Sequence, residues 1–316
     1  MPGAPKAVVL TAGLHQPDRL SRLGVRVCPL VPIANRPLLV HVLHGLRAAG
    51  VREAAILGDG ATRAAIAAVL GEGHGELAIR YVDHVDHRAL DAPAVVVQPA
   101  DALLRGSIAA AVDDVAGARL DGAVMRVGKP APASRVGACV LGPDAAAALD
   151  PGGASVDALA DALVASAEHV SVAEVRGCLA CADGDDGLLH ANRIALEGLA
   201  ASVDVASLAG SEIQGPAVIH PTARLRSTLV RGPAIIGAGV RLDDVYVGPY
   251  TAIGDDVVVE GAEIEHSLVL AGAEVRYPGV RLTTSILGPR ARLVRDFHLP
   301  RGMRVAVGAD AVVALS

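Results

Sequence analysis

Three residues that can take part in phosphate chemistry follow short apolar runs of the chain: Gly13, Asp101 and Lys129. A glycine lets the backbone approach a phosphate closely, an aspartate can hold Mg²⁺, and a lysine can neutralise phosphate charge. Arg19 adds a second cation soon after Gly13. If the apolar runs are parallel strands, these residues lie at the carboxyl edge of a sheet, where such sheets bind their ligands.

Two other groups have a spacing that metal ligands also use: a polar stretch with two histidines and two aspartates, and a C-x-x-C pair. The residues are Asp83, His84, Asp86 and His87 in the first group and Cys178 and Cys181 in the second. A solvated polar loop explains the first group better, and Cys28 and Cys139 do not form the second pair that structural zinc sites use. Four cysteines also make no disulfide framework in a chain of this length. We therefore expect small buried thiols and no zinc site.

Residues 7–200 alternate strand-like apolar runs with helix-like patterns. The predicted strands are 7–10, 54–57, 77–82, 94–97, 122–127, 136–141 and 170–180, and the predicted helices are 38–50, 61–70, 108–115, 156–167 and 186–200. Such alternation predicts an α/β fold, with a doubly wound, mostly parallel sheet that helices cover on both faces.

The apolar period changes after residue 212. Aliphatic residues then recur every six positions, and a glycine follows several of them. Examples are Ile213, Ile219 and Leu225, then Ile236 and Leu242, then Val247, Ile253 and Val259. This repeat predicts a parallel β-helix in which each coil buries one aliphatic residue per face. We place the α/β domain at residues 1–203 and the β-helix at residues 204–316, and expect a C-terminal tail or a partner to cover the last open coil.

Several stretches resemble the sugar-1-phosphate nucleotidylyltransferase family, in particular its long-type glucose-1-phosphate thymidylyltransferases. The similar stretches are residues 6–13, 28–37, 188–193, 232–237, 247–254 and 264–269. The resemblance covers nearly the whole chain and implies a nucleotidyltransferase-like α/β domain followed by a left-handed hexapeptide β-helix. Family members join a sugar 1-phosphate to a nucleoside triphosphate and release pyrophosphate, with Mg²⁺ bridging phosphate oxygens.

The resemblance implies a nucleotide-binding loop at Ala12, Gly13 and Arg19. This loop keeps one glycine of the family's glycine-rich turn, and it gains Pro17, which lacks a backbone donor. Cys28 stands where the family has a lysine, and a thiol cannot give a phosphate a permanent positive charge. The polar stretch after residue 82 leads almost directly into the next strand, so the family's base-reading helix is missing.

The resemblance also implies metal and sugar-phosphate positions. Asp101 lies at the first Mg²⁺ position, and the second falls on Cys181, so that Asp183 could serve only if the spacing differs. Lys129 lies at the sugar-phosphate position, while the family's sugar-binding glutamate has become Gly128. The charges that catalysis needs are therefore only partly present.

Composition excludes several classes of function. The net charge of −6 offers no basic field for nucleic acid, 2% aromatic residues give few stacking platforms, and no apolar run is long enough to span a bilayer. We expect a cytoplasmic protein that binds neither nucleic acid nor membranes and forms a homo-oligomer or a hetero-oligomer with an active relative.

The sequence favours a degenerate, non-catalytic or regulatory paralogue that retains weak nucleotide or sugar-phosphate binding. The alternative is an active, divergent and Mg²⁺-dependent nucleotidylyltransferase. A third possibility is an acyltransferase, because hexapeptide helices also host acetyl-CoA enzymes. Its candidate histidines are His220, His266 and His298, but no inserted loop accompanies them.

Overall fold

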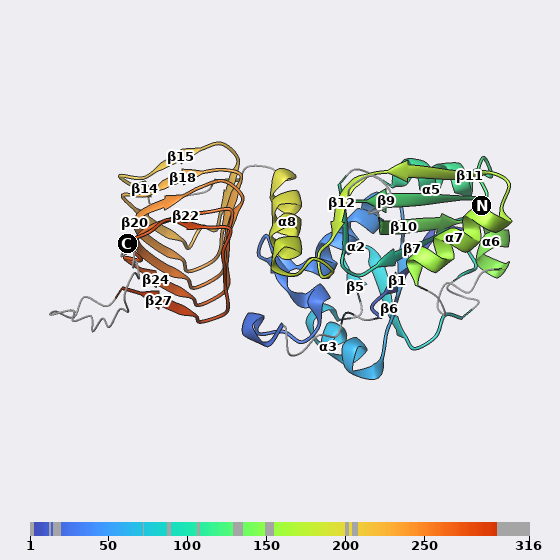
Figure 1. The fold of residues 1–316 in the computed structure, drawn as a ribbon, viewed down its shortest axis with the longest axis horizontal. Helices are drawn as coiled ribbons and strands as arrows, with labels where there is room; N and C mark the ends of the chain where they lie inside the picture. The colour runs from blue at the N-terminus through green and yellow to red at the C-terminus, as the bar shows by residue number, and fades with distance from the viewer. Residues whose placement is uncertain are drawn as a thin grey trace, which may run out of the picture.

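The protein is described by a computed structural model that covers most of the chain. The described residues are 3–12, 14, 20–71, 73–86, 90–105, 108–128, 135–148, 155–199, 202–203 and 208–295. An α/β part comes first, and stacked parallel coils follow it (Figure 1).

The α/β part is built on an eight-stranded sheet with the order β11-β9-β10-β7-β1-β4-β6-β5. The strands are β1 (Lys6–Leu10), β4 (Glu53–Leu57), β5 (Gly73–His74), β6 (Leu77–Val82), β7 (Val95–Pro99), β9 (Gly122–Val127), β10 (Arg135–Leu141) and β11 (Val170–Glu174). β10 pairs antiparallel with β7 and β9, and β5 pairs antiparallel with β6. The other pairings are parallel, which confirms the predicted mostly parallel sheet.

Helices cover both faces of this sheet because successive strand residues point to opposite sides. Ala7 and Val9 of β1 face one core with α2 (Leu38–Ala48), α3 (Gly60–Leu70) and α5 (Ala109–Ala116). Val8 faces the other core with α6 (Pro143–Ala148) and α7 (Val156–Ser166). Asp59 and Ser155 cap the starts of α3 and α7 by accepting backbone hydrogen bonds.

The strand predicted over residues 170–180 is two strands in the structure. β11 ends at Glu174, and β12 (Arg176–Leu179) leaves the main sheet to pair antiparallel with β8 (Ala102–Arg105). Gly177 permits this close pairing, since a Cβ atom there would lie 2.6 Å from the Leu103 carbonyl oxygen. α8 (Gly184–Glu197) follows β12 and starts two residues before the predicted helix.

The C-terminal strands form a parallel β-helix. One sheet contains β13 (Ser202–Val203), β16 (Ala217–Ile219), β19 (Ala234–Ile236), β21 (Thr251–Ile253), β23 (Leu268–Val269) and β26 (Ile286–Leu287). The other contains β14 (Leu208–Ala209), β15 (Glu212–Gln214), β17 (Arg224–Arg226), β18 (Leu229–Arg231), β20 (Arg241–Val247), β22 (Val258–Glu265), β24 (Glu274–Arg276), β25 (Leu282–Thr283) and β27 (Arg292–Val294). Ile219, Ile236 and Ile253 lie in register and are buried, so each coil adds one layer to a continuous core.

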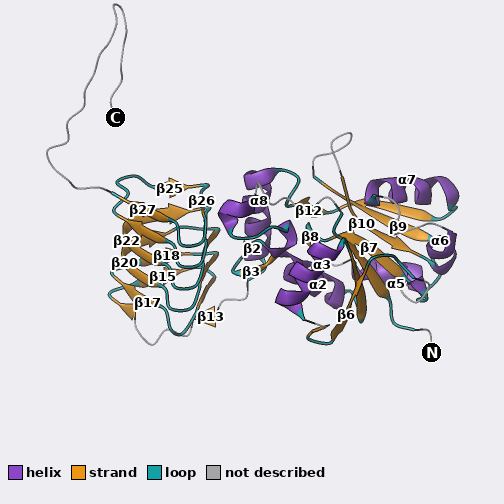
Figure 2. Ribbon diagram, turned by 90° about the horizontal axis from the view of Figure 1, so that it is seen from below, coloured by secondary structure: helices purple, strands orange, loops and turns teal. Residues whose placement is uncertain are grey.

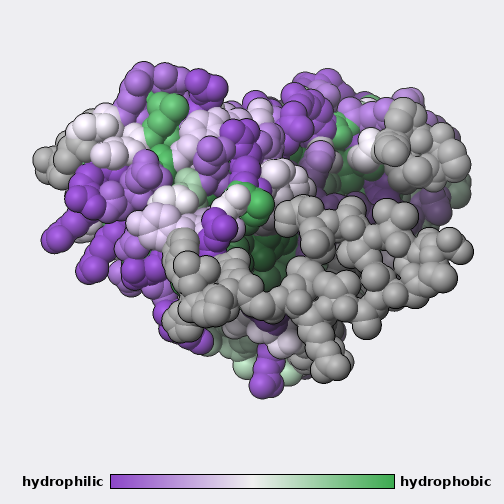
Figure 3. All heavy atoms as spheres, turned by 60° about the vertical axis from the view of Figure 1, so that its left-hand side comes forward, coloured by the Kyte–Doolittle hydropathy of each residue, from purple (hydrophilic) through white to green (hydrophobic). Residues whose placement is uncertain are grey.

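Outward-facing positions of the second sheet carry paired charges. Arg226 pairs with Asp243, and Arg276 pairs with Glu260. Figure 3 brings the β-helix end of the molecule forward and shows a largely hydrophilic surface with small, separate apolar patches. No helix among the described residues is long and apolar enough to cross a membrane.

The first sheet of the β-helix packs against the α/β part, and α8 lies between them (Figures 1 and 2). Ala252, Leu268 and Leu270 belong to the same apolar cluster as Leu23 and Leu188. This contact explains why outward positions on that sheet are apolar, whereas those of the second sheet are charged. The β-helix thus rests on the segment around residues 20–37 and on α8, and both contain stretches that resemble the family.

Candidate functional site

The segment that follows β1 folds back under the carboxyl edge of the sheet. Leu14 N–H donates to the Thr11 carbonyl oxygen, and Cys28 N–H donates to the Leu14 carbonyl oxygen at 3.0 Å. A short 3-10 helix, η2 (Cys28–Leu30), then places Cys28 in the interior, where it is 1% exposed. Of the predicted nucleotide loop, Ala12 is described, whereas Gly13 and Arg19 lie outside the described residues.

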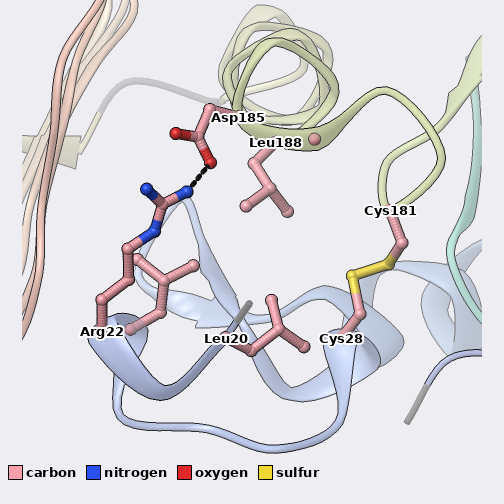
Figure 4. Close-up of a pocket in the computed structure, with 8 residues that line it drawn as sticks. Leu20, Arg22, Cys28, Cys181, Asp185 and Leu188 are labelled. Carbon is pink, nitrogen blue, oxygen red and sulfur yellow. Dashed lines mark hydrogen bonds and ion pairs between the residues drawn. A yellow bond between two sulfur atoms is a disulfide. The ribbon is translucent and has the colours of Figure 1, made fainter. Parts of the chain in front are cut away.

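Cys28 and Cys181 form a disulfide across 153 residues of sequence, with their Cα atoms 6.1 Å apart. The expectation of free thiols is therefore wrong for these two cysteines, and it holds for Cys139 and Cys178, which are buried and free. Cys28 occupies the position at which the resemblance expects a lysine, and Cys181 the position at which it expects a metal-binding aspartate. The bond joins these two positions to each other (Figure 4).

Among the described residues, the side chains beside the disulfide enclose only a small space. Leu20, Leu23 and Leu188 enclose a cavity of about 10 Å³ beside it, and an ion pair between Arg22 and Asp185 lies over this cavity (Figure 4). A cavity of this size barely holds one water molecule, whereas small-molecule pockets measure about 300–1,000 Å³.

Asp101 lies between β7 and β8 and is 4% exposed. Its Oδ2 accepts a hydrogen bond from the Cys181 N–H at 3.1 Å, and its carbonyl oxygen accepts one from the Ala180 N–H at 3.0 Å. Burial raises the pKa of Asp101, and the Cys181 N–H and the Arg135 charge oppose that rise only in part. The carboxyl group thus fixes the turn that carries Cys181, and its surroundings disfavour its charged form.

Asp183 precedes α8 and points toward solvent. Its carboxylate forms an ion pair with Arg135 at 3.0 Å, and its side chain is 58% exposed. Cys178 lies near both aspartates, and burial, followed by the charges of Asp101 and Asp183, raises the pKa of its thiol to about 12. Sequence reasoning missed Arg135, because nothing in the sequence near β10 indicates that this residue meets Asp183.

These carboxylates do not fit a Mg²⁺ site as they lie. Mg²⁺ requires charged oxygen ligands in near-octahedral geometry. Asp101 has a raised pKa and a hydrogen-bonded Oδ2, and Asp183 is engaged by Arg135. Within the described part of the chain, no three acidic, histidine or cysteine side chains gather as metal ligands do. No step of chemistry is therefore derived through a metal at this site.

The structure describes only some of the remaining predicted residues. Lys129 lies outside the described residues, and Gly128, with a φ of 101°, borders a separate cleft along α8. His84 is exposed and contacts Asp83 at 2.7 Å, while His87 lies outside the described residues. On the β-helix, the ring of His266 lies 5.3 Å from that of Tyr250.

Of the candidate acyltransferase histidines, the structure describes His220 and His266. The Nδ1 atom of His220 lies 2.9 Å from the Thr222 hydroxyl, and His298 lies outside the described residues.

Two asparagines that sequence reasoning did not single out hold the β-helix against the altered motifs. Asn35 Nδ2 donates to the Ile253 carbonyl oxygen at 2.7 Å, and Asn192 Nδ2 donates to the Tyr250 carbonyl oxygen at 3.0 Å. Asn192 Oδ1 also accepts from the Ala34 N–H at 3.0 Å, and this side chain is 1% exposed. A polar residue on the otherwise apolar face of α8 was the available signal.

Comparison with known proteins agrees with this architecture. No protein-family model matches the chain. A glucose-1-phosphate thymidylyltransferase of Streptomyces griseus is 26% identical over 357 aligned positions, which cover 96% of this chain and 97% of that protein. A second, from Streptomyces antibioticus, is 27% identical over 129 positions, covering 40% and 36% of the two chains.

A solved structure gives the same fold. The crystal structure of a putative glucose-1-phosphate thymidylyltransferase from Bacillus anthracis, in complex with a sucrose, matches with a TM-score of 0.50 at 14% identity. The match covers 63% of this chain and 98% of that one. The chain is thus similar over nearly its full length to one glucose-1-phosphate thymidylyltransferase and shares its fold with the solved structure of another such protein.

Proposed function

We propose that this chain is a non-catalytic member of its family that acts as a binding or regulatory protein. The observation that carries the proposal is the disulfide between Cys28 and Cys181. These cysteines occupy the positions where the resemblance expects a catalytic lysine and a metal-binding aspartate. A disulfide is uncharged, so the pair offers neither a cation to the phosphates nor a ligand to Mg²⁺.

Transfer of a nucleotidyl group depends on positioning and on neutralising charge that develops on the phosphates. Loss of one such contact costs about 2–4 kcal/mol of transition-state stabilisation. Here the lysine and one aspartate position are altered, and Asp101 is buried with a raised pKa. Their combined loss leaves little catalysis.

Weak binding of a nucleotide or a sugar phosphate is the activity that we assign to the α/β part. Ala12, Gly13, Arg19 and Lys129 remain as candidates for contacting phosphate groups. The β-helix, through its charged outer sheet, is the candidate surface for a second copy or for an active relative. The domain limits proposed for these two roles are 1–203 and 204–316, in a cytoplasmic protein.

The second candidate function is an active, divergent and Mg²⁺-dependent sugar-1-phosphate nucleotidylyltransferase. The observation in its favour is the similarity to a glucose-1-phosphate thymidylyltransferase over 96% of the chain. This function requires Arg19, Lys129, Asp101 and Asp183 to converge around a triphosphate. An active enzyme of this kind would release pyrophosphate.

Calorimetric titration tests the proposal. Nucleoside triphosphates, nucleotide sugars and sugar 1-phosphates are titrated into the protein, each with Mg²⁺, and the mixtures are then analysed for products. We expect binding of one ligand class without product formation, and weaker binding by Lys129→Gln than by a matched Arg52→Gln control on the exposed Arg52–Glu76 pair. No heat from any ligand would reject the binding role, and steady product formation would establish the second function.

A further inference from the structure

Three arginines share one carboxylate at the end of α8, and we call Arg105, Arg176 and Arg193 with Glu197 the arginine cluster. Glu197 Oε2 lies 2.8 Å from Arg105 Nη1 and 3.6 Å from Arg176 Nη2, and its Oε1 lies 3.3 Å from Arg193 Nε. The Glu197 side chain is only 14% exposed, whereas those of Arg176 and Arg193 are 74% and 54% exposed. The carboxylate is thus covered while two guanidinium groups face solvent.

The fold itself forces these charges together. Arg105 and Arg176 lie directly opposite each other in the pairing of β8 with β12. Like charges at directly opposite positions of paired strands repel each other. Glu197 offsets one of the three positive charges, so the cluster keeps an excess of about two positive charges. A further anion would therefore be attracted to it.

Three members of the cluster, Arg176, Arg193 and Glu197, line a cleft of about 880 Å³ that runs along α8. This volume is within the range of pockets that hold cofactor-sized ligands. The α8 residues that line the cleft recur every three or four positions, as one face of a helix requires. They are Asp186, Gly187, His190, Arg193, Ile194 and Glu197.

The acidic residues of the cleft do not cancel the cluster. Asp183 is paired with Arg135. Asp186 lies three turns before Glu197 on α8, about 16 Å away along the helix axis. Salt screens the interaction between exposed charges that are more than ~8–10 Å apart, so Asp186 has little effect on the cluster. Glu174 also lines the cleft. When its negative charge is added to those of the cluster, the sum is still positive.

Arg193 extends the cluster to the β-helix. Its guanidinium carbon lies 5.0 Å from the centre of the Tyr250 ring, and Tyr250 also accepts the hydrogen bond from Asn192. A ligand that draws Arg193 toward the cleft would compete with this contact.

We propose that the arginine cluster binds the diphosphate group of a small molecule, with the rest of the molecule lying in the cleft along α8. Guanidinium groups bind phosphate oxygens through paired, charge-assisted hydrogen bonds, and exposed Arg176 and Arg193 can make them without leaving Glu197. The diphosphate is either free inorganic pyrophosphate or part of a nucleotide. Only Arg193 of the cluster lies in a stretch that resembles the family, and the site does not depend on whether the chain is catalytic.

Calorimetry with the full-length protein tests this site. Inorganic pyrophosphate and a nucleoside diphosphate are titrated separately, without divalent metal and at about 0.15 M salt. We expect one binding site per chain. Arg176→Gln should weaken binding about tenfold or more, because it removes a charge-assisted contact. Arg176→Lys keeps the charge, and its affinity should lie between those of the wild type and Arg176→Gln. Arg119→Gln, which alters an exposed arginine paired with Asp114 instead, should bind as the wild type does.

The two ligands separate the two sources of the group. Equal affinity for both points to free pyrophosphate, and tighter binding of the nucleotide shows that the cleft holds its nucleoside. Asp101→Asn should leave both affinities unchanged, so a failure of the proposed function would not affect this result. Absence of binding by either ligand, or binding by Arg176→Gln as tight as by the wild type with its fold intact by circular dichroism, would overturn the proposal.

Discussion

Removal of the Cys28–Cys181 disulfide is expected to destabilise the α/β part strongly. The bridge closes a loop of 153 residues, and both cysteines are almost fully buried. A cross-link limits the conformations of the unfolded chain, and the loop-entropy relation gives about 5 kcal/mol for a loop of this length. The bridge also ties η2 to the start of α8, the two segments on which the β-helix rests.

Urea unfolding measures this effect with reductant as the perturbation. The midpoint of the wild type should fall when a dithiol reductant is added, since the reductant donates two electrons and two protons to yield two thiols and its own disulfide. The variant with both Cys28→Ala and Cys181→Ala should start near the reduced wild type and show no response to reductant. It therefore controls for effects of the reagent elsewhere.

The unfolded protein also reports the bridge directly. Without reductant, the denatured wild type should expose two titratable thiols, those of Cys139 and Cys178, and with reductant four. Four thiols without reductant, or a midpoint that reductant leaves unchanged, would refute the reasoning.

Three further predictions follow from buried groups. The raised pKa of Asp101 means that its stabilising contribution is complete below the ordinary aspartate pKa and is lost as pH rises through the folded value. Asp101→Asn should thus gain stability relative to the wild type between pH 4 and pH 7 in urea unfolding, and a constant difference would contradict this. Asn192→Ala should cost about 2–4 kcal/mol in the same assay because it leaves the buried Ala34 N–H and the half-buried Tyr250 carbonyl oxygen unpaired, whereas exposed His190→Ala on the same helix should cost little. A pKa of about 12 makes the Cys178 thiolate about a thousandfold scarcer than that of an ordinary thiol, so iodoacetamide should label it at pH 8 only after unfolding, and rapid native labelling would contradict the assignment.

Local patterns in the sequence predicted most of the α/β fold. The runs at 77–82 and 122–127 match β6 and β9 residue for residue, because both are apolar runs with clear limits. The division at Val175 was not predictable, since no glycine or proline interrupts residues 170–176. Only the pairing of β12 with β8, a contact between distant segments, separates the two strands.

The site was predictable in its motifs and not in its contacts. The resemblance placed Cys28 and Cys181 at the lysine and aspartate positions, but no local pattern joins residues 153 positions apart. The arginine cluster was missed for the same reason. Arg105 and Arg176 meet only through strand pairing, and Glu197 reaches them only because α8 packs on that hairpin.

The central claim is that this chain has lost the charges needed for nucleotidyl transfer, and steady-state turnover tests it most directly. The purified protein is incubated with a nucleoside triphosphate, glucose 1-phosphate and Mg²⁺, and pyrophosphate release is followed with an active glucose-1-phosphate thymidylyltransferase as the positive control. The account predicts no release above that of a sample without protein, both with and without reductant. Turnover at about 1 s⁻¹ or faster, within the range of ordinary enzymes, would contradict it.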